Sequence, residues 1–392
     1  MPKILSQRSA LILIVIAQFL GTSLWFAGNA AAPEWELILG KEGIVPMLTS
    51  VVQLGFITGT FLYALGSIPD RYSPVDVFFF SAVLASLSNL LILVLPFSYA
   101  SLLIFRFLVG FFLAGIYPVG MKIAADYFEK GLGGALGFLV GALVLGTAFP
   151  FLLKGLGITI SWKIILFSTS FLAILGGALI GFLVPNGPFR KSNPKFDLSL
   201  LPKLAKNNSL KASAGGYFGH MWELYTFWAF LPALILALTQ DSVSASQSSF
   251  WTFLVIASGG VSCALGGQIA LRKGSKQVAL FSLIGSGLCG VILLIFPGVS
   301  GFWVLPFLLF WGLLVTADSP QFSTLVAQSV SPEHRGTALT LVNSLGFGLT
   351  IVSIYLTTWL IAELDVRTAL GLLAIGPAVG ISIFFWFKNS KN

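Results

Sequence analysis

Twelve apolar stretches, each long enough for a helix that crosses a lipid bilayer, recur along the 392-residue sequence and constrain its fold more than any other feature. Only 9% of the residues are charged, whereas a soluble globular protein carries about 25%. Backbone polar groups inside a bilayer need internal partners, so these stretches are expected to be helices. We predict an all-α membrane protein with spans at residues 9–31, 46–68, 75–95, 99–121, 132–153, 161–185, 212–238, 249–271, 276–297, 301–325, 336–361 and 366–388.

The distribution of positive charge sets the expected orientation of the spans. The net charge is +8, and seventeen of the 22 Lys and Arg residues would lie in the cytoplasm if the N-terminus does. Cytoplasmic loops of membrane proteins are rich in these residues. We therefore expect a multi-pass protein of the cell membrane, with both termini cytoplasmic. The basic charge is attributed to topology and to anionic lipid headgroups, and no nucleic-acid partner is expected.

The longest polar stretch separates the sixth span from the seventh and predicts two halves. We assign residues 1–185 to an N-terminal six-helix bundle, residues 186–211 to a cytoplasmic linker and residues 212–392 to a C-terminal six-helix bundle. Part of the linker could lie as an amphipathic segment on the inner leaflet, or be a solvated basic connection.

The two halves also share residues at a nearly constant offset, which is typical of duplicated transporters. Arg71 in GSIPDRYS recurs as Arg272 in GQIALRKGSK, at an offset of 201. Pro118 recurs as Pro320, at an offset of 202. These two prolines are expected to bend their helices.

Three ionisable residues lie inside apolar stretches: Arg106, Glu223 and Asp318. A charge near the centre of a bilayer costs about 2.5–3.5 kcal/mol, so each must face a partner or a water-filled cavity. Such residues usually mark the path of a substrate or proton. The alternative interpretation is a structural ion pair inside the protein.

Polar neighbours extend this set of candidates. The first span carries four residues at helical spacings of 4, 3 and 4, which predicts one polar face: Gln18, Thr22, Trp25 and Asn29. In the seventh span, His220 lies three residues before Glu223 and shares its face, with Tyr225 nearby. A histidine and a carboxylate so placed can bind a divalent metal, relay a proton or hold a cationic substrate. Tyr117 follows Arg106 by eleven residues and is expected on the same face.

The chain resembles the major facilitator superfamily over its full length. GSIPDR is similar to the G-x-x-x-D-R signature of that family, and RFLVG, which begins at Arg106, resembles an R-x-x-x-G element of many proton-coupled members. The resemblance implies two pseudo-symmetric six-helix bundles, with spans 1, 4, 7 and 10 around a central cavity. It also implies a gate formed by Asp70, Arg71 and Arg272. The three intramembrane ionisable residues fall on spans 4, 7 and 10.

The sequence therefore predicts a secondary active transporter that moves a small organic solute by alternating access and is coupled to protons. One positive and two negative groups favour a cationic or zwitterionic solute. Arg106 and Asp318 are expected to act as a coupling pair across the two halves. Binding or coupling roles are assigned to Arg106, Glu223, Asp318, His220, Tyr117, Gln18, Thr22, Trp25, Asn29 and Tyr225.

Three other functions stay open at this stage. The chain could be a proton-antiport exporter of drugs or metabolites, a divalent-metal transporter that uses His220, Glu223 and Asp318, or a transporter-like sensor. By the resemblance, a nitrate carrier of this family would be expected to have arginines in its second and eighth spans, and this sequence has none there, so nitrate is disfavoured. No phosphate-binding loop or hydrolase motif is found, so neither an enzyme nor a cofactor or resident metal is expected. The expected partners are a small-molecule substrate, protons and membrane lipids, with the protein a monomer.

Overall fold

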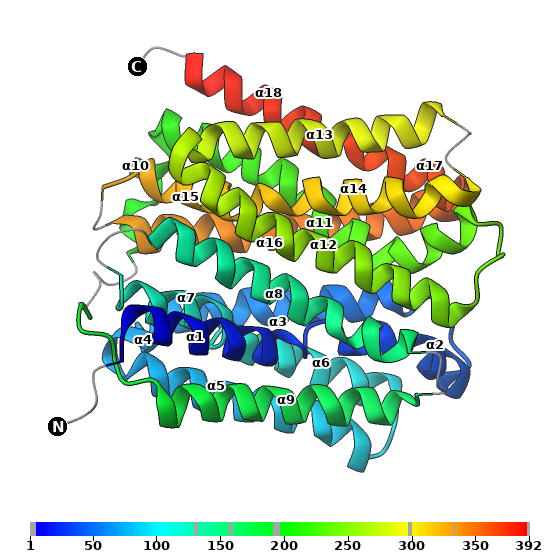
Figure 1. Ribbon diagram of the computed structural model, residues 1–392, viewed down its shortest axis with the longest axis horizontal. Coiled ribbons are helices and arrows are strands. Elements are labelled where there is room, and N and C mark those ends of the chain that lie inside the picture. Colours follow the sequence, from blue (N-terminus) through cyan, green and yellow to red (C-terminus); the bar gives the residue numbers. More distant parts are fainter. Residues whose placement is uncertain are drawn as a thin grey trace. The chain divides into compact units, whose positions relative to one another are not determined.

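A computed structural model of the protein describes residues 5–128, 132–156, 160–190, 197–296, 300–331 and 334–389. Within these ranges every regular element is helical, and twelve helical segments are long and apolar enough to cross a membrane (Figure 1). The twelve spans and the all-α fold predicted from the sequence are confirmed.

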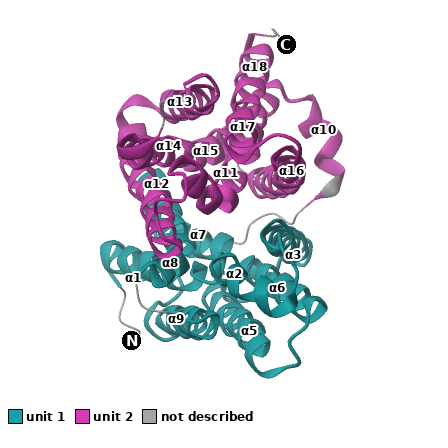
Figure 2. Cartoon of the chain, turned by 90° about the vertical axis from the view of Figure 1, so that its right-hand side faces the viewer, with its two compact units in different colours: residues 1–195 teal, residues 196–392 magenta. Residues whose placement is uncertain are grey.

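The chain divides into two compact units, residues 1–195 and 196–392, with six spans in each (Figure 2). The expected linker, residues 186–211, contains the boundary between them. Its described part includes the short helix η1 (Leu198–Leu200), α10 (Leu201–Lys206) and the first residues of the seventh span. The limits of the linker stay a prediction.

Some helices of unit 1 begin at a residue whose side chain caps them. Ser73 and Ser98 accept hydrogen bonds from the backbone N–H groups of Asp76 and Ser101, which satisfies donors that a helix start leaves free. The helices are α1 (Gln7–Thr22), α2 (Ala27–Leu39), α3 (Val45–Leu65), α4 (Ile68–Arg71), α5 (Pro74–Val94), α6 (Tyr99–Leu113), α7 (Tyr117–Ala125), α8 (Leu132–Gly155) and α9 (Trp162–Leu183).

Unit 2 follows the same plan with longer helices. Ser244 caps its second span and forms a reciprocal capping box with Gln247. The helices are α11 (Asn208–Leu238), α12 (Ala245–Lys273), α13 (Ser275–Ile295), η2 (Gly301–Trp303), α14 (Val304–Ala317), α15 (Ser319–Gln328), α16 (Arg335–Glu363), α17 (Val366–Gly371), η4 (Leu372–Ala374) and α18 (Ile375–Asn389).

Three spans that carry candidate residues are interrupted by a turn. Residues 114–116 separate α6 from α7, and α14 meets α15 at Asp318. Pro118 and Pro320 occupy equivalent positions in the first turn of α7 and of α15. Proline has no N–H to continue a helix, so the expected bends are confirmed. The third break, residues 23–26 between α1 and α2, contains no proline.

Within each unit, glycines bring pairs of spans into close contact. A Cβ atom on Gly110 of α6 would lie 2.0 Å from the carbonyl oxygen of Val52 in α3. In unit 2, a Cβ on Gly219 of α11 would lie 2.6 Å from the carbonyl oxygen of Gly376 in α18. Lipid tails are as apolar as the side chains they replace, so helices in a membrane associate mainly through such close packing.

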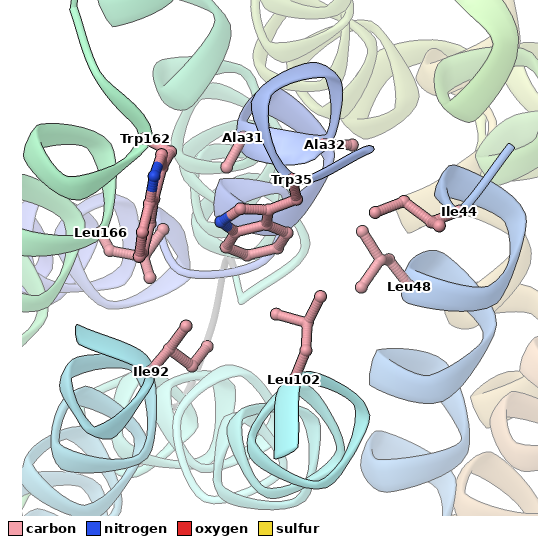
Figure 3. Packing of buried hydrophobic residues seen from close by; sticks show 9 residues of the cluster. All are labelled: Ala31, Ala32, Trp35, Ile44, Leu48, Ile92, Leu102, Trp162 and Leu166. Atoms are coloured by element: carbon pink, nitrogen blue, oxygen red, sulfur yellow. The ribbon is translucent and has the colours of Figure 1, made fainter. Parts of the chain in front are cut away.

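An aromatic cluster closes one end of unit 1. Trp35 of α2 lies at its centre, surrounded by Leu48 of α3, Ile92 of α5, Leu102 of α6 and Trp162 of α9 (Figure 3). The ring centroids of Trp35 and Trp162 are 5.9 Å apart at an interplanar angle of 69°. This edge-to-face geometry is the favoured one for aromatic pairs. The cluster therefore fixes α2, the second half of the first span, against four other spans.

Candidate functional site

In unit 1 the intramembrane arginine donates hydrogen bonds to the backbone of the turn that interrupts the first span. Arg106 of α6 is fully buried. Its Nη2 donates to the carbonyl oxygens of Leu24, at 3.1 Å, and Trp25, at 2.6 Å. Both carbonyls lie in the turn between α1 and α2, where the helical hydrogen-bond pattern is interrupted. The guanidinium thus satisfies backbone acceptors that would be costly to leave unpaired inside a membrane.

Asn89 of α5 completes this network, and the sequence analysis did not single it out. Its Oδ1 accepts a hydrogen bond of 3.1 Å from Nη1 of Arg106. Its Nδ2 donates to the carbonyl oxygen of Leu166, at 3.2 Å, and to Oγ of Ser170, at 3.0 Å, both on α9. Four spans therefore meet at one arginine. The one amide side chain in a largely apolar span was the available signal for this position.

The four candidate residues of the first span are buried, but they do not lie on one continuous helix. The turn at residues 23–26 interrupts the face that their spacing predicts. Thr22 donates to the carbonyl oxygen of Gln18, at 2.7 Å, and Asn29 donates to Oγ1 of Thr49 in α3, at 2.7 Å. Trp25 packs on the ring of Phe56, with centroids 4.9 Å apart.

Two buried amides of unit 1 have no hydrogen-bond partner among the described residues. They are Gln18 of α1 and Gln53 of α3, and for each of them both side-chain polar atoms lack a partner. Gln53 is fully buried one turn after Thr49 and was also missed by the sequence analysis. Buried polar groups in proteins are usually paired. These amides are therefore candidates to hydrogen-bond a polar ligand.

In unit 2, Glu223 of α11 is held by two neutral donors. Its Oε2 accepts a hydrogen bond of 2.7 Å from Oγ of Ser286 in α13, and its Oε1 accepts one of 2.6 Å from Nε1 of Trp311 in α14. All three side chains are buried. The Trp311 ring also stacks on Phe227, with centroids 4.6 Å apart. Two neutral hydrogen bonds orient the carboxyl group but do not neutralise a negative charge there.

One turn earlier on α11, His220 pairs with the second intramembrane acid. Its Nδ1 lies 2.8 Å from Oδ1 of Asp318, and both side chains have no exposed surface. Asp318 is the residue at which α14 ends and α15 begins. The pair therefore joins the seventh span to the break in the tenth. Sequence spacing placed His220 beside Glu223, whereas the structure gives each of these residues its own partner.

The two tyrosine candidates differ in their surroundings. Tyr225 is buried between the rings of Trp228 and Phe347, with centroid distances of 5.2 and 5.3 Å. Tyr117 is half-buried at the start of α7. The turn at residues 114–116 lies between it and Arg106, so their eleven-residue spacing does not fix a shared face. Their roles as ligands stay predictions.

Two of the expected gate residues, Asp70 and Arg71, lie in the short helix between the second and third spans, and Arg272 lies at the end of the eighth. Asp70 of α4 forms an ion pair of 2.7 Å with Lys122 of α7, while Arg71 and Arg272 are exposed. Asp126, at the end of α7, is buried next to this pair. Burial raises the pKa of its carboxyl group above the usual value, and Lys122 and Arg190 oppose that shift.

The described residues contain no group of three or more His, Cys, Asp or Glu side chains arranged to hold a metal ion. Of the three residues in the divalent-metal hypothesis, His220 contacts Asp318, while Glu223 is bound by Ser286 and Trp311. Cys263 and Cys289 are buried and free. Sγ of Cys263 donates to the carbonyl oxygen of Thr316, at 3.2 Å, just before the break in span 10.

Twelve apolar helices in two six-span units, with buried ionisable residues inside the spans, define a multi-pass membrane protein. The chain belongs to the Major Facilitator Superfamily, whose model matches residues 12–349. It is therefore a secondary transporter rather than an enzyme.

Comparison with solved structures supports the same fold. The chain is similar to a crystal structure of a bacterial homologue of the human lysosomal transporter Spinster, in an inward-facing and occupied conformation. The two share 15% sequence identity with a TM-score of 0.68, over 98% of this chain and 97% of the other. None of the curated proteins compared with the chain matches it in sequence.

Proposed function

We propose that this carrier moves a small cationic or zwitterionic organic solute and couples that movement to protons by alternating access of its two units. The observation that carries the proposal is Glu223, a fully buried carboxyl group whose two hydrogen-bond donors are both neutral. A negative charge in such a place is stabilised when a proton or a cationic group joins it. Binding of either one therefore competes with binding of the other.

The pair formed by His220 and Asp318 supports the coupling step. A histidine and a carboxyl group in contact can exchange a proton, and histidine changes its charge within the physiological pH range. Because Asp318 is also the point where span 10 bends, a change in this contact acts directly on the bend. Proton uptake and the shape of the span are thereby linked.

Charge also supports the proposed class of solute. Arg106 has hydrogen bonds to two carbonyl groups and an amide, so its charge is engaged in holding unit 1 together. The buried acidic groups of unit 2, Glu223 and Asp318, outnumber the one histidine that is buried among the described residues of this unit, His220. A cation, or the ammonium group of a zwitterion, fits the acidic unit better than an anion does. Gln18, Asn29 and Gln53 would contribute neutral hydrogen-bonding groups.

We also propose that the protein spans the cell membrane and that both of its termini lie in the cytoplasm. It rests on the bias of Lys and Arg toward one set of loops. A membrane-impermeant maleimide tests it, since the native cysteines are buried. Ser242→Cys, in the turn after α11, should react from outside intact cells, and Lys273→Cys, at the end of α12, only after lysis.

The decisive experiment measures transport by the full chain in proteoliposomes with an imposed proton gradient. Solutes are first selected by thermal-shift screening of the purified protein against amines, amino acids and other small metabolites. Glu223→Gln keeps hydrogen-bonding ability and removes the charge, and the exposed Glu363→Gln serves as its matched control. Unchanged uptake and unchanged pH dependence in Glu223→Gln would reject the proposal.

A further inference from the structure

A pocket of about 410 Å³ lies in unit 2, among the ends of α11, α15 and α18. Its polar lining includes the hydroxyl groups of Ser209, Ser213 and Ser329, and its apolar lining includes Phe384 and Phe387. Lys388 of α18 also lines the pocket. Polar side chains, an ammonium group and aromatic rings together fit a ligand that has an anionic head and an apolar body.

Two further lysines gather at the same rings. Nζ of Lys276 of α13 lies 5.8 Å from the ring centroid of Phe384, and Nζ of Lys211 of α11 lies 4.8 Å from that of Phe387. Lys276 and Lys388 also interact directly through their side chains. Two ammonium groups in contact repel each other, and an anion between them relieves the repulsion.

The carboxyl groups described in the structure do not neutralise this lysine cluster. Among the described residues, the salt bridges are those of Lys122 with Asp70, Lys154 with Glu34 and His220 with Asp318. Lys211, Lys276 and Lys388 therefore have no acidic partner among these residues. Such an uncompensated cluster attracts an external anion.

The position of the pocket along the spans indicates where that anion comes from. The pocket and its lysines lie at the starts of the seventh and ninth spans and at the ends of the tenth and twelfth. In the orientation inferred from the positive charges, all four of these ends are cytoplasmic. This is the depth of the headgroups of the inner leaflet, where lysine near a membrane span interacts with anionic lipids.

We propose that this pocket binds the phosphate headgroup of an anionic lipid from the cytoplasmic leaflet, with Lys276 and Lys388 on the phosphate and the rings of Phe384 and Phe387 along the glycerol and upper acyl chain. The hydroxyl of Ser209 then donates to a phosphate oxygen, while the hydroxyls of Ser213 and Ser329 keep their hydrogen bonds to the carbonyl oxygens of Ser209 and Leu325. Since the lipid contacts spans 7, 9, 10 and 12 at once, its binding stabilises unit 2. The inference does not depend on which solute is carried or on proton coupling.

The test uses the full-length protein in nanodiscs made of phosphatidylcholine alone or of phosphatidylcholine with phosphatidylglycerol. The readouts are the Tm of the protein and the phosphatidylglycerol retained in native mass spectra. The test variants are Lys276→Gln combined with Lys388→Gln, and Lys388→Glu alone. The control is Lys163→Gln, because Nζ of Lys163 lies 5.7 Å from the ring of Trp162 in unit 1, a geometry close to that of Lys276.

We expect phosphatidylglycerol to raise the Tm of the wild type and of Lys163→Gln equally. In both test variants that rise should be lost, and retained lipid should fall by roughly tenfold, since two charges that attract the headgroup are removed or opposed. Equal Tm values of all proteins in pure phosphatidylcholine show that the variants are folded. Should one test variant fail to fold, the other decides the outcome.

Two results would overturn the inference. The first is an undiminished effect of phosphatidylglycerol on the test variants, which would mean that the lipid acts elsewhere. The second comes from adding inorganic phosphate or glycerol 3-phosphate to nanodiscs of pure phosphatidylcholine. If these soluble anions reproduce the full rise in Tm through the same lysines, the occupant is a soluble phosphate and not a lipid.

Discussion

Arg106 donates a hydrogen bond of 2.6 Å to the carbonyl oxygen of Trp25, and this contact joins α6 to the turn that interrupts the first membrane span. An arginine inside a membrane usually suggests a substrate or proton path. Here its polar contacts are backbone carbonyls and an amide of the same unit. The contact therefore makes Arg106 a residue that keeps the broken first span in place.

The first prediction concerns Arg106→Lys. Lysine keeps the charge but offers a single ammonium group, which cannot replace the planar arrangement of guanidinium donors that reaches Leu24, Trp25 and Asn89. We expect the free energy of unfolding to fall by at least about 2 kcal/mol, seen as a lower Tm of the purified protein without any solute. The exposed Arg8→Lys is the matched control and should change little. A wild-type Tm in Arg106→Lys would contradict this structural role.

The second prediction concerns Asn89→Leu, with a substitution of the neighbouring Ser88 as the control. Asn89→Leu removes the acceptor of Arg106 and the donor to α9, and so leaves buried polar groups unpaired. The expected cost is about 1–3 kcal/mol of stability. Among the described residues, the hydroxyl of Ser88 bonds only to the carbonyl oxygen of Leu84 on its own helix, so Ser88→Ala should be nearly neutral. Equal Tm losses in the two variants would argue against a special role for Asn89.

The sequence predicted those features of the structure that depend on neighbouring residues, and not those that depend on contacts between residues far apart in the chain. Apolar length is local, and it predicted the twelve spans. Proline is also local, and it predicted the breaks at Pro118 and Pro320. No comparable local signal marks the break at residues 23–26, where the backbone is held by Arg106, more than eighty residues away in the sequence. Spacing alone therefore described the polar face of the first span as continuous.

The same difference between local and long-range features applies to the candidate site. Burial of Arg106, Glu223 and Asp318 followed from their positions within apolar stretches. The hydrogen-bond partners of these three residues could not be predicted, because periodicity identifies a face of a helix but not the helix that packs on it. Trp311 gave no signal as a partner of Glu223, since tryptophan is common in apolar spans. The pairing of Arg106 with Asp318 would join two different units and stays a prediction.

The third prediction concerns Asp318→Asn. Asparagine retains the size of the side chain but cannot take up a proton or balance a charged His220. We expect proton-driven accumulation of solute to be abolished, while exchange of labelled for unlabelled solute continues. Both are measured in proteoliposomes, with the exposed Asp241→Asn as control. Full-rate accumulation by Asp318→Asn would remove this residue from the coupling step.

The fourth prediction concerns the ion pair of Asp70 with Lys122. If this pair helps to latch one conformation of the carrier, Asp70→Asn shifts the populations of conformations and leaves the affinity within each of them unchanged. Spin labels at Leu37→Cys and Ser242→Cys report the distance between the units. Asp76→Asn removes an exposed acidic group nearby and should leave the distance distribution as in the wild type. Lost binding without a population shift would count against a gate.

The last prediction follows from the raised pKa of Asp126. Because burial raises its pKa in the folded protein above that of the unfolded chain, the protonated form is favoured by folding. The stability that this preference contributes is fully present below the unfolded pKa and is lost as the pH rises through the folded one. The Asp126→Asn protein has no carboxyl group at this position and does not lose this stability as the pH rises. Its Tm relative to the wild type should therefore increase as the pH is raised from about 4 to about 8.

Differential scanning fluorimetry of both proteins across this range measures that difference. Asp76→Asn controls for the removal of one negative charge, and Lys122, Arg190 and Asp70, which act on Asp126, are left intact. The direction of the change is the test, because a general effect of lower negative charge would shift the whole curve without tilting it. Parallel curves for Asp126→Asn and the wild type would show that this carboxyl group is ionised alike in the folded and unfolded chains.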